Sequence, residues 1–211
     1  MHQSRFVRIV DFGEIVGSAF AGFELGDQFF SSPAVRDFAR GGPAPLLPEG
    51  ITESEKRGRK FFEDTFDPKN LKAGACAACH SGPMLDRTNQ FFPVPAGSRF
   101  QSAGVSEFNE ARDPVYTFVF RQPDGSEKTV VSPDPGRALI TGKFEDANQF
   151  KISALRGLRK TSPYFHDNSA RTLEEVAAHY ARLFAVVVPN NELILSAQDQ
   201  ADIAAYLRLL E

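Results

Sequence analysis

The two cysteines of this 211-residue chain lie close together and are followed directly by a histidine. Cys76, Cys79 and His80 read C-x-x-C-H, and the sequence contains no other cysteine. Two thiols at this spacing can form thioether bonds to a haem, and the adjacent imidazole can bind the haem iron. The pattern therefore predicts one covalent haem c, with His80 as an axial ligand.

Two other kinds of site use similar spacing. A redox-active cysteine pair of the thioredoxin type is expected within a βαβ unit, which the surrounding sequence does not indicate. A zinc site needs further ligands, and no second cysteine pair exists in the sequence. Covalent haem attachment is therefore the favoured interpretation.

The second face of the iron distinguishes an electron carrier from an enzyme that catalyses a reaction at the iron. Neither methionine is suited, because Met1 is terminal and Met84 follows His80 by only four residues. A ligand from the protein would close the second position, whereas a vacant position would admit a substrate. The remaining candidates are two histidines and two tyrosines, His166, His179, Tyr164 and Tyr180, whereas His2 is remote in the sequence.

A capped helix is expected directly before the motif. Thr52 and Glu55 have the spacing of a capping box, and the helix should run to about Asp64. Gly58 and Phe62 lie four residues apart on it. A glycine that faces an aromatic residue lets two helices cross closely, which is how the N- and C-terminal helices of c-type cytochromes pack.

Two further helices are expected in the second half of the chain. Residues 171–184 form one of them, with a capping box at Thr172 and Glu175. The last helix begins after Ser196. Its apolar residues are spaced as one buried stripe: Ile203, Tyr206, Leu207 and Leu210.

The apolar face of the 171–184 helix separates two of the ligand candidates. Tyr180 lies near the middle of this face, whereas His179 lies about 100° round the helix, at its edge. Tyr180 is therefore expected to point into the haem pocket, although a tyrosine on such a face is also typical of an ordinary core residue. The face is formed by Leu173, Val176, Ala177, Leu183 and Phe184.

Composition narrows the class of protein. A net charge of −3 and a pI near 5.9 do not favour a nucleic-acid-binding protein. No apolar run reaches the roughly 18 residues of a membrane span. Because haem c is attached outside the bacterial cytoplasm, we expect a periplasmic or otherwise exported protein. The first residues make a poor export signal, since Asp11 and Glu14 interrupt the apolar stretch.

A stretch rich in glycine and proline, residues 39–50, indicates a boundary. We expect an N-terminal extension over residues 1–44, which could contact a partner, and a c-type cytochrome domain over residues 45–211. Residues 115–131 predict a β-hairpin that turns at Pro123-Asp124-Gly125. The expected fold class is mainly α: a cytochrome c-type haem domain with long loops and a small β-hairpin insertion.

Four stretches resemble the C-terminal haem domain of the bacterial dihaem cytochrome c peroxidase and MauG family. They read GRKFFED…CAACHSGPMLD, DPGRALITG, FKISALRGLRKTSPYFHDNSARTLEEVAAHY and LSAQDQADIAAYLRLL. The resemblance extends over about residues 45–211. It implies a distal ligand fourteen residues after the histidine of the H-D motif, methionine in the peroxidases and tyrosine in MauG-type enzymes. Counting from His166 gives Tyr180, with His179 and His166 as alternatives.

The resemblance implies further contacts. Arg156 matches an arginine of the family's L-R-N motif and could bind a haem propionate, with Arg137 as a second candidate for this role; the alternative for both is an exposed arginine. Carbonyl groups matching Thr161 and Pro163 bind calcium between the two haem domains of the family. Another calcium ligand comes from the N-terminal domain, so a complete calcium site is not expected from these residues alone.

The sequence departs from the family in one respect. A full member has two C-x-x-C-H motifs, whereas residues 1–44 are too short for a haem domain and contain no cysteine. The favoured function is a monohaem cytochrome domain that passes single electrons to or from a redox partner protein or a second haem subunit. The alternative is a haem peroxidase or oxidase that acts on hydrogen peroxide, with a displaceable Tyr180 and with His166 or His179 as a proton shuttle. A purely structural or sensory haem is a third interpretation.

Overall fold

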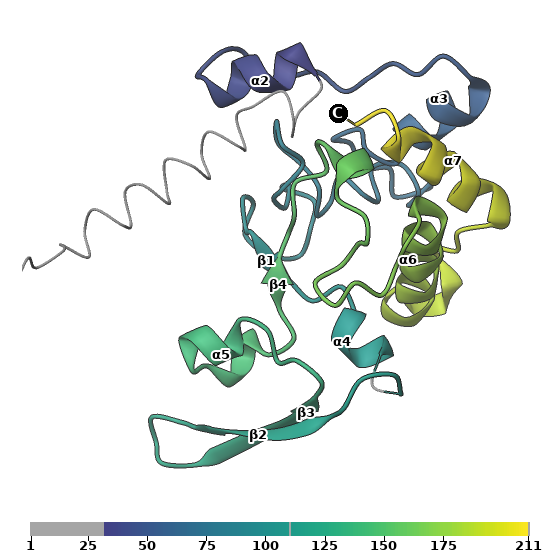
Figure 1. Ribbon diagram of the computed structural model, residues 1–211. Helices are drawn as coiled ribbons and strands as arrows, with labels where there is room; N and C mark the ends of the chain where they lie inside the picture. Colours follow the sequence, from purple (N-terminus) through teal and green to yellow (C-terminus); the bar gives the residue numbers. More distant parts are fainter. Residues whose placement is uncertain (1–31, 110, 211) are drawn as a thin grey trace, which may run out of the picture. The chain divides into compact units, whose positions relative to one another are not determined.

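The computed structural model describes residues 32–109 and 111–210, which form parts of two compact units (Figure 1). The first unit covers residues 1–46 together with residue 211. Its described part contains one helix, α2 (Pro33–Ala39), which begins with a proline where no amide hydrogen is needed. Most of the predicted extension over residues 1–44 lies outside the described residues, so that division of the chain stays a prediction.

The second unit, residues 47–210, is mixed and rich in loops. Its described helices are α3 (Glu53–Arg59), α4 (Val105–Phe108), α5 (Ala138–Thr141), α6 (Leu173–Val187) and α7 (Ala197–Leu207), with short 3₁₀ helices η1 (Phe144–Asp146), η2 (Leu158–Lys160) and η3 (Pro189–Asn191). Two antiparallel pairs of strands join β1 (Phe100–Gln101) to β4 (Phe150–Lys151), and β2 (Tyr116–Arg121) to β3 (Glu127–Ser132). The expectation of a mainly α fold is thus only partly correct, because the many glycines and prolines keep most helices to one or two turns.

The predicted starts of the three longer helices are confirmed. Capping boxes begin α3 and α6 at Thr52 and Thr172, and Ser196 begins α7 with a box of its own that uses Asp199. In each box the side chain of the first residue accepts a hydrogen bond from a backbone amide one turn later, and the acidic side chain of that later residue accepts one from the amide of the first. Helix α6 continues to Val187, three residues beyond its expected end.

Helix α3 ends at Arg59 rather than near Asp64, and the reason lies in the motif that follows it. The carbonyl oxygen of Phe61 accepts hydrogen bonds from the amides of Cys76, at 2.9 Å, and Ala77, at 3.1 Å. A carbonyl used in this way does not continue an α-helical hydrogen-bond ladder. The helix therefore ends where the backbone begins to form hydrogen bonds with the C-x-x-C-H turn.

The predicted close crossing of the helix before the C-x-x-C-H motif, α3, and the last helix, α7, is confirmed. A Cβ atom added to Gly58 on α3 would lie 2.1 Å from the carbonyl oxygen of Asp202 and 2.7 Å from the Cβ atom of Tyr206, both on α7. The rings of Phe62 and Tyr206 pack at a centroid distance of 5.3 Å. Ile203 and Tyr206 are almost completely buried.

Gly58→Ala is expected to destabilise the protein by at least about 2 kcal/mol, because the added methyl group meets backbone and the helices must move apart. For a unit of this size the midpoint of thermal unfolding should fall by about 4–8 °C. The loss should appear although alanine favours helix formation over glycine by about 1 kcal/mol. Lys56→Ala, at an exposed position of α3, is the control. An unchanged midpoint in Gly58→Ala would contradict the close crossing.

The same crossing contains a buried carboxylate. Asp202 is 2% exposed and accepts hydrogen bonds from Nε and Nη2 of Arg57, at 2.7 and 2.9 Å. Ser54 Oγ and Gln198 Nε2 donate further bonds to it, at 2.6 and 2.8 Å. The hydrogen bonds from Arg57 are the main reason that the pKa of Asp202 is lowered, although burial opposes them.

A carboxyl group whose pKa is lower in the folded state stabilises the protein above its unfolded pKa, near 3.9, and loses this effect as the pH falls through the folded pKa. Asp202→Asn should therefore cost about 1.5–3 kcal/mol at pH 7, and the difference from wild type should shrink below about pH 4. Urea unfolding at pH 7, 5 and 3 measures this. Glu53→Gln, which removes an exposed ion pair with Lys56, should show almost no difference at any of these pH values.

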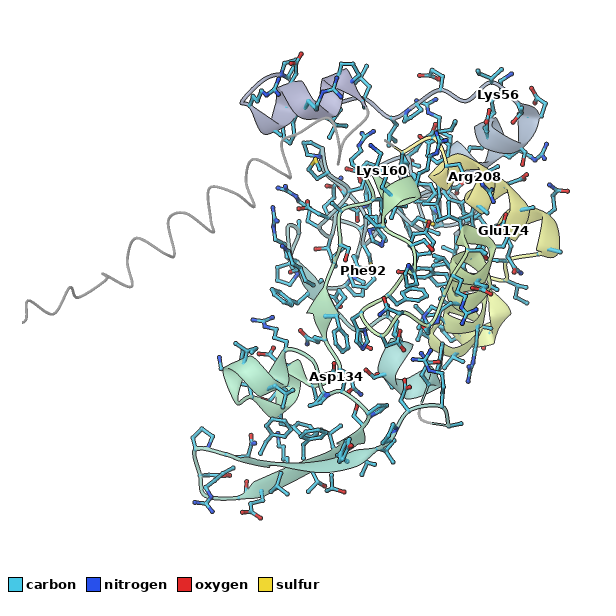
Figure 2. All side chains as sticks on the ribbon, viewed as in Figure 1. Lys56, Phe92, Asp134, Lys160, Glu174 and Arg208 are labelled. Atoms are coloured by element: carbon cyan, nitrogen blue, oxygen red, sulfur yellow. The ribbon has the colours of Figure 1, made fainter. Side chains whose placement is uncertain are left out.

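Helices α6 and α7 pack together around the main hydrophobic core. An ion pair between Glu174, at the start of α6, and Arg208, at the end of α7, joins their outer surfaces (Figure 2). The buried core consists of Phe61, Phe62, Leu85, Leu173, Ala177, Leu193, Leu195, Ile203, Ala204, Tyr206, Leu207 and Leu210. Among the described residues, no helix has the length and apolar character needed to cross a membrane.

The predicted hairpin is also confirmed. Strands β2 and β3 pair from Tyr116–Ser132 to Arg121–Glu127 and turn between Gln122 and Ser126. Its inner face packs on η1, where the ring of Phe120 lies 6.3 Å from that of Phe144. The hairpin is thus attached to the loop-rich part of the unit rather than to the helical core.

Candidate functional site

The C-x-x-C-H motif forms a single helical turn. The amide of His80 donates to the carbonyl oxygen of Cys76 at 2.8 Å, and that of Cys79 donates to the same oxygen at 3.2 Å. Residues three and four positions apart share one side of such a turn. Both cysteines are free thiols, which leaves them available for covalent attachment.

Burial raises the pKa of both thiols, Cys76 and Cys79, to about 12. Redox-active cysteine pairs have the opposite property, because their reactive thiol must be a thiolate near neutral pH. This argues against the thioredoxin-type interpretation of the motif.

His80 is held in one orientation by the loop that follows it. Its Nδ1 atom lies 2.9 Å from the carbonyl oxygen of Leu85. Because a carbonyl only accepts hydrogen bonds, Nδ1 carries the proton and the lone pair of Nε2 remains available. Burial lowers the pKa of His80, whereas the bond to Leu85 and the charge of Asp86 raise it. A neutral imidazole with one fixed nitrogen and one free nitrogen is the arrangement of a metal-binding histidine.

These donors fit haem c. Two thiols and one available imidazole nitrogen lie on one turn, in the order and spacing that covalent attachment requires. Cys76, Cys79 and His80 are the residues that would hold the group.

Tyr180 lies close to these thiols and is partly buried. Burial is the main cause of a raised pKa for its phenol, and the neighbouring Cys79 and Cys76 raise it further. Within residues 32–109 and 111–210 no hydrogen bond to the Tyr180 hydroxyl is found. The hydroxyl is not among the buried unpaired side-chain atoms of the described residues, so it is accessible, and its place near the two thiols leaves it available to a ligand there.

His179 faces a different environment from its neighbour Tyr180. Its Nε2 atom donates to the carbonyl oxygen of Ala103 at 2.7 Å, and its ring lies between those of Phe108 and Phe165, at centroid distances of 5.4 and 4.5 Å. The rings of His179 and Tyr180 lie 5.6 Å apart and both contact Phe165, but the hydrogen bond to Ala103 ties His179 to the segment that precedes α4.

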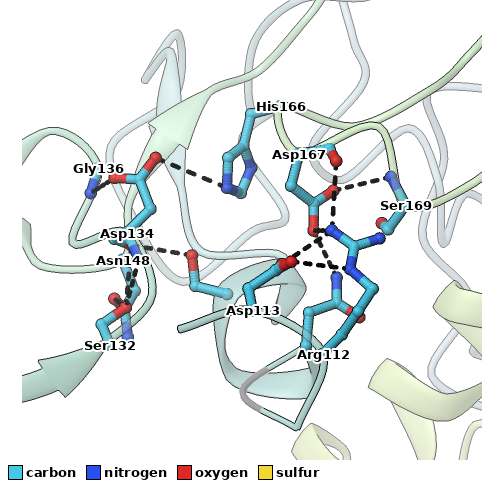
Figure 3. Close-up of polar contacts among 11 residues, drawn as sticks. Arg112, Asp113, Ser132, Asp134, Gly136, Asn148, His166, Asp167 and Ser169 are labelled. Carbon is cyan, nitrogen blue, oxygen red and sulfur yellow. Dashed lines mark hydrogen bonds and ion pairs between the residues drawn. The ribbon is translucent and has the colours of Figure 1, made fainter. Parts of the chain in front are cut away.

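His166 lies in a polar cluster beside α4 (Figure 3). Its ring stacks on Phe150 at 3.6 Å, and its Nε2 atom lies 3.9 Å from Asp134. The carboxylate of Asp167 instead forms an ion pair with Arg112 and accepts a hydrogen bond from Asn109. The structure brings none of these groups into contact with the C-x-x-C-H turn.

The remaining predicted residues have local partners. The hydroxyl of Tyr164 donates to the carbonyl oxygen of Leu158 at 3.1 Å. Arg156 is 4% exposed, and its Nε atom donates to the carbonyl oxygen of Pro83, in the loop after His80, at 3.3 Å. The alternative of an exposed arginine is therefore wrong for Arg156.

Arg137 lies over the ring of Phe100 at 4.6 Å and forms an ion pair with Asp146 at 3.4 Å. Neither contact points to a haem propionate. Among the described residues there is no group of three histidine, cysteine, aspartate or glutamate side chains that could hold a metal ion. A surface cavity of about 400 Å³ between Tyr164 and Arg208 includes none of the haem-binding candidates except Tyr164.

Reasoning from the sequence missed the loop that supports His80. Leu85 supplies the carbonyl group that orients the imidazole, and Asp86 supplies a nearby charge. Sequence spacing gives no sign of either role, because the carbonyl belongs to the backbone and reaches His80 only through the path of the loop.

Comparisons with known proteins agree with the motif. No family model matches the chain. The chain is 30% identical over 122 residues to cytochrome c551 peroxidase of Nitrosomonas europaea, which covers 57% of this chain and 28% of that protein. It is 28% identical over 172 residues to the cytochrome-c peroxidase IdrP1 of Pseudomonas sp. strain SCT, covering 76% of this chain and 40% of that protein.

The chain thus spans less than half the length of these curated relatives. A solved MauG-like protein associated with microbial copper homeostasis aligns over 84% of this chain and 47% of its own, with 24% identity and a TM-score of 0.49. Both of these sequence relatives are cytochrome c peroxidases. The chain is thus similar in sequence to bacterial cytochrome c peroxidases.

Proposed function

We propose that residues 45–211 form a monohaem c-type cytochrome domain that carries single electrons and corresponds to the C-terminal haem domain of the dihaem relatives. One covalent haem c is attached to Cys76 and Cys79, with His80 as its proximal ligand and Tyr180 as its distal ligand. The observation that carries the proposal is the Tyr180 hydroxyl, which lies near both thiols without a hydrogen bond from the described residues.

Haem c supplies a reversible one-electron couple between ferric and ferrous iron. The chain's own residues set the conditions for this couple. His80 keeps its proton on Nδ1, where Leu85 accepts it. Tyr180, at the centre of α6, closes the second position to small molecules. Arg156 is buried beside the loop after His80 and is suited to a propionate.

Peroxidase or oxidase activity requires an open position and a nearby group that moves protons. The two histidines considered for this role are engaged elsewhere: His179 with Ala103, and His166 with Phe150 and Asp134. This supports electron transfer over peroxide chemistry.

The proposed partner is a redox protein or a second haem subunit that exchanges electrons with this domain. We further propose that the protein is exported, since covalent haem attachment occurs outside the bacterial cytoplasm. A calcium ion at Thr161 and Pro163 would need additional ligands from such a partner.

The deciding experiment is the ferric absorption spectrum of the purified holoprotein, before and after addition of hydrogen peroxide. A low-spin spectrum that peroxide leaves unchanged, together with reversible reduction and reoxidation, supports an electron carrier. A high-spin spectrum that changes with peroxide would overturn closure of the site and favour the peroxidase alternative. A protein without covalent haem would overturn both.

A further inference from the structure

The loop between His80 and Arg87 closes on itself beside the proposed proximal ligand. Ser81 and Arg87 form a bridge in which the Ser81 amide donates to the Arg87 carbonyl oxygen at 2.8 Å. The Asp86 amide donates back to the Ser81 carbonyl oxygen at 3.1 Å. The path of this loop brings the carbonyl group of Leu85 to Nδ1 of His80.

Leu85 adopts a backbone conformation that leucine normally avoids. Its φ angle is 56°, in the left-handed region, and its side chain is almost fully buried. Such a residue persists only where its surroundings hold it, and this strain often accompanies a functional contact. Here polar contacts hold the loop around Leu85. Its own carbonyl oxygen binds His80, and the carboxylate of the next residue, Asp86, is paired with two arginines.

Asp86 is the charged anchor of the loop. Its carboxylate is 11% exposed, accepts a hydrogen bond from Nε of Arg87 at 3.1 Å and forms an ion pair with Nη1 of Arg99 at 2.8 Å. Arg99 in turn directly precedes β1, and its carbonyl oxygen accepts from the amide of Ile152, which directly follows β4, at 2.8 Å. The carboxylate therefore ties the loop that orients His80 to the β1–β4 pair.

We propose that Asp86 is a positioning residue for His80 and that its negative charge, set against Arg99, lowers the reduction potential of the haem proposed above. The inference rests on the proposed function, because it requires haem on His80. One-electron reduction adds negative charge to the haem, and a carboxylate nearby disfavours that change while a guanidinium favours it. The two partners of this ion pair should therefore act on the potential with opposite signs.

The test is an electrochemical titration of the holoprotein, with the electrode as the electron donor. Asp86→Asn should raise the equilibrium constant for reduction about tenfold, which corresponds to 59 mV for a one-electron couple. Arg99→Gln should lower the same constant by at least twofold, with a smaller effect because its side chain is 45% exposed. Asp113→Asn is the matched control, since it removes a partly buried carboxylate paired with Arg112 and should change the constant by less than twofold.

Haem content, measured by absorbance in the same preparations, separates the two proposals. If the wild type carries covalent haem but Asp86→Asn shifts the constant by less than twofold, or if Asp86→Asn and Arg99→Gln shift it in the same direction, the inference fails and the proposed function stands. Should Asp86→Asn not fold, an upward shift or no shift in Arg99→Gln overturns the inference. Wild type without haem overturns both.

Discussion

Replacing both Cys76 and Cys79 by alanine is expected to abolish covalent haem attachment completely. The two thiols lie on one turn, are not joined in a disulfide, and are the only cysteines of the chain. No other side chain of the sequence can form the thioether bonds, so the loss should be total rather than graded. The measurement is haem absorbance, or the mass of the chain, after denaturation and removal of unbound haem.

The single variants and a neighbouring substitution sharpen this test. Cys76→Ala and Cys79→Ala each leave one thiol and should retain a smaller amount of bound haem. Ala78→Ser, between the two cysteines, adds a polar group without removing a thiol and should retain attachment. Covalent haem in the double variant would contradict attachment through these cysteines. A disulfide in place of haem in the wild type would contradict the proposal and favour a redox-active cysteine pair.

The local signals of the sequence identified the helices but not where they end. Thr52 and Thr172 predicted their helices because a capping box involves only residues within one turn of each other. The end of α3 could not be predicted, since it depends on Phe61 accepting hydrogen bonds from Cys76 and Ala77, fifteen and sixteen positions later. The role of Gly58 in a close helix crossing could be predicted, because a glycine within a helical pattern usually has a packing reason. In the structure that reason is the close approach of α7.

The candidate site was likewise predictable from the sequence only in part. The order of Cys76, Cys79 and His80 predicts their shared turn, because three neighbouring residues need no tertiary contact to lie together. Helical periodicity favours Tyr180 over His179 as the ligand, and this stays a prediction; in the structure the two rings lie 5.6 Å apart, and His179 bonds to Ala103. The support of His80 by Leu85 could not be predicted, because it depends on a backbone carbonyl in a strained loop.

Tyr180→Phe is expected to change the ferric spectrum from low-spin to high-spin, because it removes only the hydroxyl group proposed to bind the iron. The opened position should then bind small ligands such as cyanide or azide at least tenfold more tightly than the wild type does, a difference of about 1.4 kcal/mol. Spectrophotometric titration of the holoprotein measures both effects.

Stability should hardly change in Tyr180→Phe, and this separates loss of a ligand from general damage. Its ring keeps its contacts with Phe165 and Phe184, at centroid distances of 6.2 and 6.1 Å. Because no hydrogen bond from the described residues reaches the hydroxyl, its removal should leave no buried polar group unpaired. The thermal midpoint of the haem-free protein should therefore shift by the equivalent of about 0.5 kcal/mol or less.

Two further variants identify the ligand if the prediction is wrong. Tyr164→Phe loses the bond to Leu158 but should keep the wild-type spectrum, since that hydroxyl already has a backbone partner. His179→Gln loses the bond to Ala103 and should likewise leave the spin state unchanged. If Tyr180→Phe retained the wild-type spectrum while His179→Gln altered it, the histidine would be the ligand and α6 would have to rotate on binding haem. If none of the three variants altered a high-spin spectrum, the second position would be open, and the domain would have the vacancy that peroxide chemistry requires.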